Sequence, residues 1–239
     1  MNTQMPAFRW TMKQTWEHFP FAHWPVPVEA IRSFVPEALD IDTWDGQAWI
    51  SILPFRIGEI RLKHMPSLPW MRSFPEINVR TYVRSGGESA IFFLSMGASH
   101  PLLVPIAKQW YRLPYHLAKM RFRAGGRTIT FESRRRSASF SEEAFCTTYR
   151  PVSAPFAVRQ GTVEHWLMER YIYYCRCGRS GGLYRGEVVH APWELQTAEA
   201  DFSCRALTRG FGLELGTPAL LHYSRGTRAL IGLCRKAPK

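Results

Sequence analysis

The stretch Glu76-Ile77-Asn78-Val79-Arg80-Thr81-Tyr82-Val83-Arg84 decides the fold of this chain. Apolar and polar residues alternate along it with a period of two, which predicts a β-strand whose faces meet different surroundings. The Ile77 face is apolar or neutral throughout, whereas the Glu76 face carries Asn78, Arg80, Tyr82 and Arg84. In an open sandwich the polar face would meet water. In a closed barrel it would face the interior, where the polar groups would have to hydrogen-bond to one another.

Four glycine-containing turns lie between strand-like segments on either side of this stretch. Glycine supplies the positive φ that a tight turn needs, so each turn predicts a β-hairpin. The predicted pairs are Leu39–Thr43 with Gln47–Phe55, Glu76–Arg84 with Ser89–Ser95, Tyr115–Arg123 with Thr128–Arg135, and Tyr171–Cys177 with Leu183–His190. Four hairpins favour a largely antiparallel sheet that closes or folds over itself.

Helical signals are few. We predict three short helices, at Pro27–Val35, Leu102–Tyr111 and Thr162–Arg170. Prolines mark the limits of the first two, and the hydroxyl of Thr162 can cap the third. The fold class is therefore α+β, mainly antiparallel β, with a few flanking helices. We expect one domain over residues 1–239, with a core of about 10–235, because neither half has enough strands of its own.

The composition is that of a globular protein, with 46% hydrophobic and 21% charged residues among 239. The 31 basic and 19 acidic residues give a net charge of +12. This charge leaves a polyanion as an alternative partner. Nucleic acid is nevertheless disfavoured, because the basic residues are scattered and no nucleic-acid-binding motif occurs. The basic cluster Ser133-Arg134-Arg135-Arg136-Ser137 is expected to be a solvated rim.

The five cysteines show neither zinc-site spacing nor a disulfide framework. They are Cys146, Cys175, Cys177, Cys204 and Cys234. Reduced thiols and a cytoplasmic location are the simplest expectation. No apolar stretch approaches the ~20 residues that span a bilayer, and the first ten residues lack the apolar region of a signal peptide. We therefore expect no membrane association.

The candidate site combines the polar strand face with a second segment. Glu76 could act as an acid or a base, and the neighbouring Arg80 could bind the anionic group of a substrate. Tyr115 and His116 can both move a proton, although strand alternation separates them and a lone histidine is often structural. We predict catalytic roles for Glu76, Tyr115 and His116. The predicted ligand-binding residues are Arg80, Asn78, Tyr82 and His23.

No metal or cofactor is expected. His165 and Glu169 lie at i, i+4, which suits one face of a metal site, but no third ligand is evident. The glycine-rich motifs that bind nucleotide phosphates are also missing from the sequence.

Seven segments, taken in order, resemble the YqjF-like family of unknown function, over about residues 10–235. These segments are Phe21-Ala-His-Trp-Pro-Val-Pro, Leu39-Asp-Ile-Asp-Thr-Trp-Asp-Gly-Gln-Ala-Trp, Pro54-Phe-Arg, Phe74-Pro-Glu-Ile-Asn-Val-Arg-Thr-Tyr-Val, Leu113-Pro-Tyr, Glu164-His-Trp-Leu-Met-Glu-Arg-Tyr and His190-Ala-Pro-Trp. The resemblance implies the acetoacetate-decarboxylase-like fold, a closed cone-like β-barrel with flanking helices. It favours a polar strand face that lines a cavity.

The same resemblance bears on activity. Decarboxylases of this fold use a Schiff-base lysine, one of two adjacent lysines that follow a proline and precede Leu-Ala. The similar stretch here reads Pro114-Tyr115-His116-Leu117-Ala118, and neither tyrosine nor histidine can form a Schiff base with a ketone. Glu76 resembles the glutamate of the family's preceding hairpin.

We therefore expect an uncharacterised protein with a pocket for a small-molecule carboxylate or carbonyl compound, and not an acetoacetate decarboxylase. Catalysis of a lyase or hydrolase type without a Schiff base stays open, as does assembly into a homo-oligomer. The alternatives are a basic protein that binds polyanions and a non-catalytic structural or interaction protein.

Overall fold

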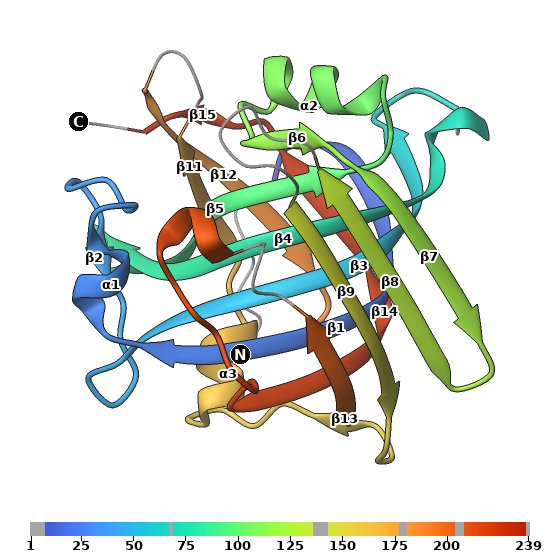
Figure 1. Ribbon diagram of the computed structural model, residues 1–239. Coiled ribbons are helices and arrows are strands. Elements are labelled where there is room, and N and C mark those ends of the chain that lie inside the picture. Colours follow the sequence, from blue (N-terminus) through green and yellow to red (C-terminus); the bar gives the residue numbers. More distant parts are fainter. Residues whose placement is uncertain (1–7, 67–68, 136–142, 177–180, 204–207, 238–239) are drawn as a thin grey trace.

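The computed structural model describes residues 8–66, 69–135, 143–176, 181–203 and 208–237, and strands dominate it (Figure 1). The strands are β1 (Trp10–Val26), β2 (Asp40–Ile41), β3 (Ala48–Leu62), β4 (Arg72–Ser85), β5 (Glu88–Ala98), β6 (Tyr115–Leu117), β7 (Lys119–Gly125), β8 (Thr128–Arg135), β9 (Glu143–Pro151), β10 (Phe156–Ala157), β11 (Ile172–Arg176), β12 (Leu183–His190), β13 (Glu194–Ser203), β14 (Leu220–Gly232) and β15 (Arg235–Lys236). The helices are α1 (Val28–Arg32), α2 (Leu103–Trp110) and α3 (Val163–Met168), with 3-10 turns η1 (Pro69–Met71) and η2 (Arg209–Phe211).

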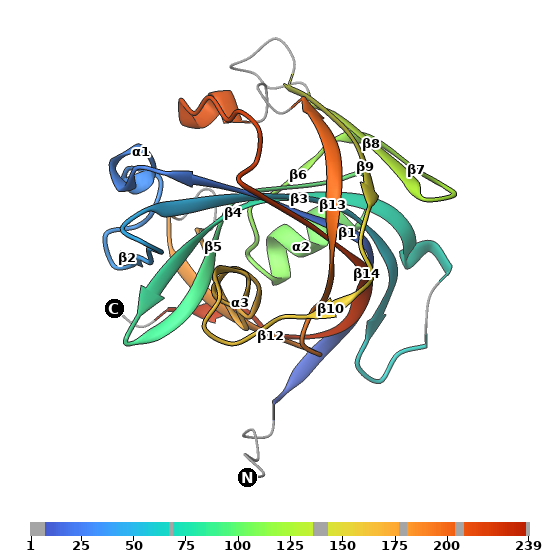
Figure 2. The same cartoon turned by 90° about the horizontal axis from the view of Figure 1, so that it is seen from below.

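Seven strands pair side by side in a ring. Their order is β12-β11-β5-β4-β3-β1-β14, and β14 pairs back onto β12, where Val188 lies opposite Ile231. We refer to these strands as the strand ring. Their pairings are antiparallel except for that of β11 with β5. Figure 2 looks into the ring from below, with α3 across the near end and α2 at the far end. In Figure 1 these helices lie at the bottom and at the top, respectively.

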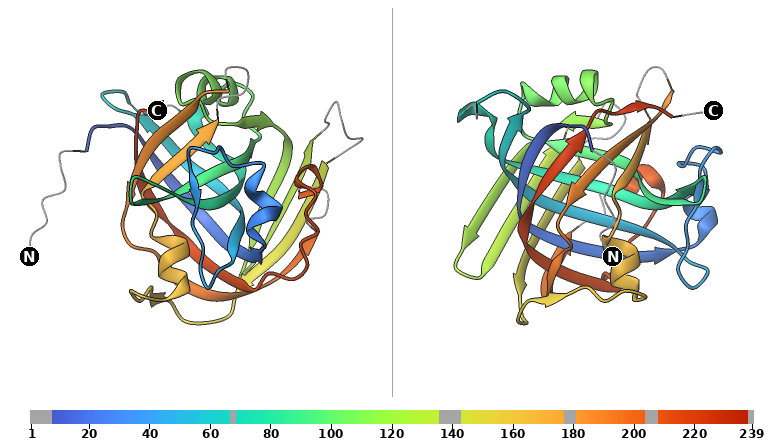
Figure 3. Two further views of the ribbon diagram at one scale, coloured as in Figure 1. Left: turned by 90° about the vertical axis from the view of Figure 1, so that its left-hand side faces the viewer. Right: turned by 180° about the vertical axis from the view of Figure 1, so that it is seen from behind.

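A second sheet continues from β14 and covers one side of the strand ring. It consists of β13, β9, β8 and β7, in that order (Figures 1 and 3). Its inner side chains, among them Phe131 and Phe145, share a hydrophobic cluster with Ile52, Ile77 and Val79 of the ring. The outer face of β3 and β4 is therefore buried against the second sheet.

The predicted alternation along β4 is confirmed. Ile77 and Val79 are each 1% exposed, between the strand ring and the second sheet. The opposite face does not meet water either, because Glu76 is only 4% exposed and Tyr82 is fully buried. Of the two alternatives for the polar face, the solvated one is thus wrong for Glu76 and Tyr82. Arg80 is half-buried, and only Arg84, at the end of the strand, is exposed.

Three predicted hairpins are confirmed, namely β4–β5, β7–β8 and β11–β12. The hairpin at Asp45-Gly46 is wrong as a strand pairing: β2 pairs with β4, and only a Trp44–Gln47 bridge closes the turn. The reason is that β3 already has β1 on one edge and β4 on the other. The predicted strand at Tyr115–Arg123 is in fact two strands, and the first of them, β6, pairs in parallel with β5.

The three predicted helices are present, each slightly shorter than expected. In α3 the backbone N–H of His165 donates to Oγ1 of Thr162 at 3.3 Å, which confirms the predicted cap. None of the helices in the described part of the chain has the length and apolar character needed to cross a membrane.

Cys146, Cys175 and Cys234 form no disulfide bond with another described residue. The other two cysteines, Cys177 and Cys204, lie outside the described residues, as do Arg136 of the basic cluster and residues 178–180 of the β11–β12 turn.

Candidate functional site

A cavity of about 250 Å³ lies within the strand ring, and every strand of the ring contributes to its wall. Most of the lining side chains are apolar. The exceptions with a polar head group are Gln14, Glu76, Asn78, Arg80, Tyr115, Arg170 and His190, besides Tyr111 and Tyr173. Four of the residues singled out from the sequence, Glu76, Asn78, Arg80 and Tyr115, therefore line the same cavity.

Glu76 is the central acidic group of this cavity. Its side chain is buried, and desolvation raises its pKa to about 8. The hydrogen bonds from Tyr115 and Asn78 favour the ionised form and lower the pKa, but by less than desolvation raises it. The amide nitrogen of Asn78, oriented toward its acceptors, donates to Oε1 of Glu76 at 3.1 Å. At neutral pH the carboxyl group is therefore mostly protonated.

Tyr115 faces Glu76 from β6. Burial raises the pKa of its phenol well above 10, and the neighbouring Glu76 raises it further. Because the two side chains are hydrogen-bonded, they form a buried pair that holds its protons at neutral pH. One O–H group is used between them, and the other can be donated into the cavity.

Arg80 lies four residues farther along the same face of β4. Its Nη2 donates to the backbone oxygen of Leu167 in α3 at 3.3 Å. Its Nε is buried and has no hydrogen-bond partner among the described residues. No carboxylate of the described residues forms an ion pair with it, so this guanidinium group carries an uncompensated positive charge.

Arg170 is a site residue that the sequence analysis missed. It follows α3, is 4% exposed, and pairs through Nη1 with Oδ2 of Asp42 at 2.7 Å. Its Nε donates to the backbone oxygen of Trp166 at 2.6 Å, while its Nη2 is buried without a partner among the described residues. Burial lowers its pKa, and the contact with Asp42 opposes that effect.

His23 and Tyr82, both predicted to bind ligand, do not line the cavity. They lie behind its wall in a hydrogen-bonded chain: Tyr82 contacts Oγ of Ser51 at 2.6 Å, and Ser51 contacts Nδ1 of His23 at 2.6 Å. The Tyr82 ring lies 5.7 Å from the guanidinium carbon of Arg80 and 5.3 Å from that of Arg170. Tyr82 thus packs against both arginines and fixes their positions. Burial places the pKa of His23 well below 6.5.

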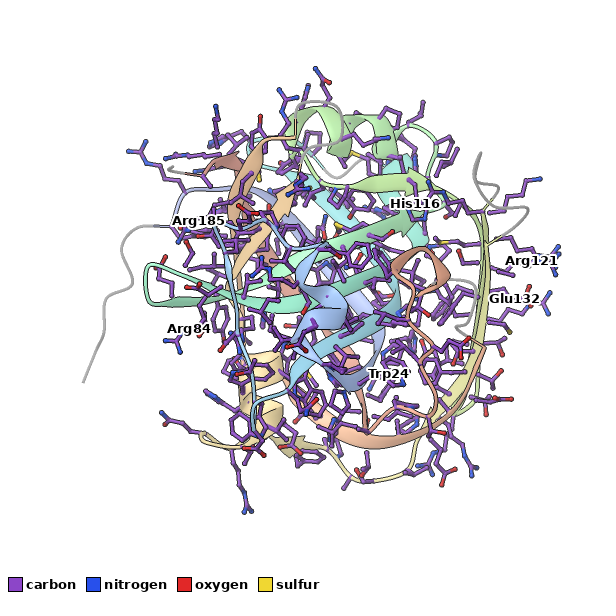
Figure 4. All side chains as sticks on the ribbon, turned by 60° about the vertical axis from the view of Figure 1, so that its left-hand side comes forward. Trp24, Arg84, His116, Arg121, Glu132 and Arg185 are labelled. Carbon is purple, nitrogen blue, oxygen red and sulfur yellow. The ribbon has the colours of Figure 1, made fainter. Side chains whose placement is uncertain are left out.

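His116, predicted to be catalytic, faces away from the cavity. Its Nε2 lies 2.8 Å from where a Cβ on Gly97 would be, and its Nδ1 is 3.5 Å from Oγ of Ser95. Figure 4 labels it on β6, close to the second sheet. Burial lowers its pKa to about 4. Strand alternation is the reason, since it turns Tyr115 inward and His116 outward.

His190, at the end of β12, does line the cavity, unlike His23 and His116. Its Nδ1 is 2.7 Å from the backbone oxygen of Ala191, and its ring packs on Trp193 and Tyr171. Burial lowers its pKa, so the imidazole is neutral at neutral pH. In the sequence, His190 was noticeable only as a histidine before Ala-Pro-Trp at the end of a predicted strand, which does not indicate a place in the cavity wall.

The mouth of the cavity is apolar and exposed. Met65, Trp70, Ile106 and Trp110 line the cavity. They are nevertheless 42%, 47%, 37% and 61% exposed, respectively. Met65 and Trp70 lie near η1, and the other two lie on α2.

Among the described residues no three His, Cys, Asp or Glu side chains are grouped to hold a metal ion. Glu169, which lies at i, i+4 from His165, accepts hydrogen bonds from the Tyr171 hydroxyl and from the backbone N–H of Trp193. Other charged side chains point into solvent, as Figure 4 shows for Arg84 and Arg121.

The arrangement of the strands is that of the acetoacetate-decarboxylase-like proteins. Acetoacetate decarboxylase from Legionella pneumophila matches with a TM-score of 0.68 and 12% identity, over 99% of this chain and 93% of that one. An acetoacetate decarboxylase-like enzyme from Sphingomonas wittichii RW1 matches with a TM-score of 0.62 and 10% identity, over 100% and 99% of the two chains. The enduracididine biosynthesis enzyme MppR, complexed with pyruvate, matches with a TM-score of 0.60 and 10% identity, over 98% and 93%. At these identities the likeness establishes the fold alone.

The sequence identifies the family within that fold. Residues 13–228 match the DUF2071 family, described as an uncharacterized conserved protein, and the chain belongs to this family. It is 41% identical to the uncharacterized protein YqjF of Bacillus subtilis (strain 168) over 236 residues, which is 98% of this chain and 96% of that protein. The resemblance to the YqjF-like proteins is therefore confirmed.

Proposed function

We propose that this protein binds a small organic acid inside the strand ring, which acts as a closed barrel around the ligand. The carboxylate of the ligand would accept hydrogen bonds from Arg80 and Arg170. A carbonyl or hydroxyl group farther along the ligand would accept a hydrogen bond from the Glu76–Tyr115 pair, which has one O–H left after the bond between its two members.

One observation carries this proposal: two arginines of the cavity wall each have a buried guanidinium nitrogen without a partner among the described residues. A buried N–H group that lacks an acceptor costs about 1–3 kcal/mol, and a carboxylate is the acceptor that a guanidinium group binds best. Asp42 balances the charge of Arg170 alone. Since Glu76 is mostly protonated at neutral pH, the charge of Arg80 is left for the ligand.

The proteins of similar fold support the same ligand chemistry. MppR is described in complex with pyruvate, and acetoacetate, which names the decarboxylases, is also a keto acid. Sequence identities of 10% and 12% transfer no residue roles, so the proposal for this chain rests on its own arginines.

We further propose that binding takes place without a Schiff base. The described residues that line the cavity include no lysine, and Lys108 and Lys119, which flank β6 in the sequence, are exposed. Any reaction would then use proton transfer by Glu76, whose pKa of about 8 lies close to neutral pH.

A thermal-shift panel of short keto acids, carboxylates and esters tests the proposal. An acid at 100 times its Kd stabilises the folded protein by about 2.7 kcal/mol, which raises the Tm of a chain of this length by about 5–10 °C. Arg80→Ala should abolish the shift. Arg84→Ala, on the same strand but exposed, should leave it unchanged. An acid that shifts the Tm of Arg80→Ala as much as that of the wild type would contradict the proposal.

The Schiff-base part has its own test. Borohydride treatment of the protein with acetoacetate or pyruvate should give no covalent adduct by mass spectrometry. A trapped adduct on any lysine would overturn this part while leaving the carboxylate site in place.

A further inference from the structure

The polar and apolar groups of the cavity are separated along β4. Arg80 lies toward α3, whose Leu167 oxygen it contacts, and Arg170 follows the same helix. Glu76 comes next along the strand, and Phe74 lies at the other end, near η1. The cavity thus has a cationic end near α3 and an apolar end near η1 and α2.

The distance between these ends exceeds the size of a small keto acid. Residues in an extended strand rise by about 3.3 Å each, so four residues separate Glu76 from Arg80 by roughly 13 Å. Phe74 lies about 20 Å from Arg80 by the same measure. A ligand bound at the arginines must therefore be elongated if it is also to reach Glu76 and the apolar end.

The apolar end is unusual for its exposure. Trp110 is 61% and Trp70 is 47% exposed, although both belong to the cavity wall. Large apolar side chains that are exposed together mark a binding surface more often than chance, and these are continuous with the cavity. Trp70 is held in place, since Nε2 of His100 lies 2.7 Å from its backbone oxygen.

We propose, on the basis of the proposed function, that the ligand is an amphipathic acid: a carboxylate on an unbranched alkyl chain. The carboxylate lies at Arg80 and Arg170, and the chain passes Glu76 and ends between Trp70 and Trp110. An extended alkyl chain advances by roughly 1.3 Å for each carbon, so a chain of about sixteen carbons covers the roughly 20 Å between the arginines and the apolar end. The deeper part of such a chain fills the cavity of about 250 Å³, and the rest lies in the open mouth.

The middle of the cavity is compatible with an alkyl chain. Glu76 is hydrogen-bonded to Tyr115 and Asn78, and its raised pKa keeps it neutral near pH 7. An alkyl chain beside these groups therefore leaves no charge buried and unpaired, and it breaks none of their hydrogen bonds.

Isothermal titration calorimetry with acetate, hexanoate, octanoate, decanoate and hexadecanoate tests the inference, with octanol as the uncharged partner of octanoate. Each methylene added from hexanoate to octanoate should lower the Kd by about fourfold, because it enters an apolar wall. Octanol should bind at least tenfold more weakly than octanoate, because it lacks the charge-assisted hydrogen bonds.

Two variants locate the two ends of the ligand. Arg80→Gln should weaken octanoate by about tenfold or more, and Arg84→Gln, its exposed neighbour on β4, should not. Trp110→Ala should weaken hexadecanoate several-fold and leave acetate and pyruvate unchanged. Phe156→Ala, an exposed aromatic outside this cavity, is its matched control.

The outcomes separate this inference from the proposed function. Short keto acids that bind as tightly as octanoate, with no dependence on chain length, would overturn the inference and leave the proposed function intact. Octanol that binds as well as octanoate would also overturn it. If no carboxylate of any length binds, the proposed function fails and the inference fails with it.

Discussion

The two faces of β4 meet different surroundings, although most side chains on both are buried. Ile77 and Val79 pack against Phe131 and the rest of the second sheet. On the other face Glu76 and Arg80 line the cavity, and Arg80 has hydrogen-bonding capacity that no described side chain uses. The first face shows how the fold is held together, and the second shows where it binds.

This difference has a physical basis. Apolar side chains gain free energy from any tight contact, whereas buried polar groups must find specific partners. A cavity wall that buries a carboxyl group and guanidinium nitrogens of two arginines therefore lowers the stability of the protein unless a ligand compensates. The substitutions below test this difference between the packed side and the cavity side of β4.

The largest effect is expected from Phe131→Ala on the packed face. Phe131 is fully buried between β8 and the strand ring, so its removal leaves a cavity and should lower the free energy of unfolding by about 3–5 kcal/mol. Urea denaturation measures this loss. Phe122→Ala, opposite Phe131 on β7 and only half-buried, should cost clearly less. Equal costs would contradict the role given to the packed face.

Glu76→Gln should change how stability depends on pH. The unfolded chain ionises this residue near pH 4.5, but the folded protein does so only near 8. The folded state therefore holds the extra proton between these values, and stability falls as pH rises through the window, by up to about 1.4 kcal/mol per pH unit. The glutamine variant lacks this fall.

The measurement is the free energy of unfolding of both proteins at intervals from pH 6.5 to 9. The difference between them should grow up to about pH 8 and then level off. Glu199→Gln, at an exposed position, serves as the control. Parallel pH profiles for wild type and Glu76→Gln would show that Glu76 is not buried as described.

Tyr115→Phe should have a smaller effect, about 1 kcal/mol, because it removes one hydrogen bond to a buried carboxyl group. That hydrogen bond lowers the pKa of Glu76, so its loss should move the titration of Glu76 to higher pH. NMR of the Glu76 carboxyl carbon follows this titration directly. A shift to lower pH would contradict the Glu76–Tyr115 contact.

His116→Gln should have the smallest effect. His116 is half-buried, makes only a 3.5 Å contact with Ser95, and faces away from the cavity. Stability should change by less than about 1 kcal/mol, and the affinity for octanoate should stay within twofold of wild type. A tenfold loss of affinity would restore His116 to the site predicted from the sequence.

The sequence was sufficient for the local features of this site. Alternation along β4 brought Glu76, Asn78 and Arg80 to one face, and alternation along β6 separated Tyr115 from His116. These predictions worked because strand geometry fixes the direction of each side chain with no knowledge of the rest of the fold.

Features that depend on distant contacts were missed. Arg170 was noted only as the last residue of a predicted helix, because its partner Asp42 lies 128 positions away. The pairing of β2 with β4 escaped prediction for the same reason. The apolar mouth was missed because the helical pattern of α2 does not reveal that its exposed Trp110 also borders a cavity.

A crystal structure of the protein with hexadecanoate tests the central claim most directly. The account predicts the carboxylate within hydrogen-bonding distance of Nε of Arg80 and Nη2 of Arg170, with the chain running past Glu76 toward Trp70 and Trp110. A carboxylate bound at the mouth, or on the protein surface with both arginine nitrogens still unpaired, would contradict it.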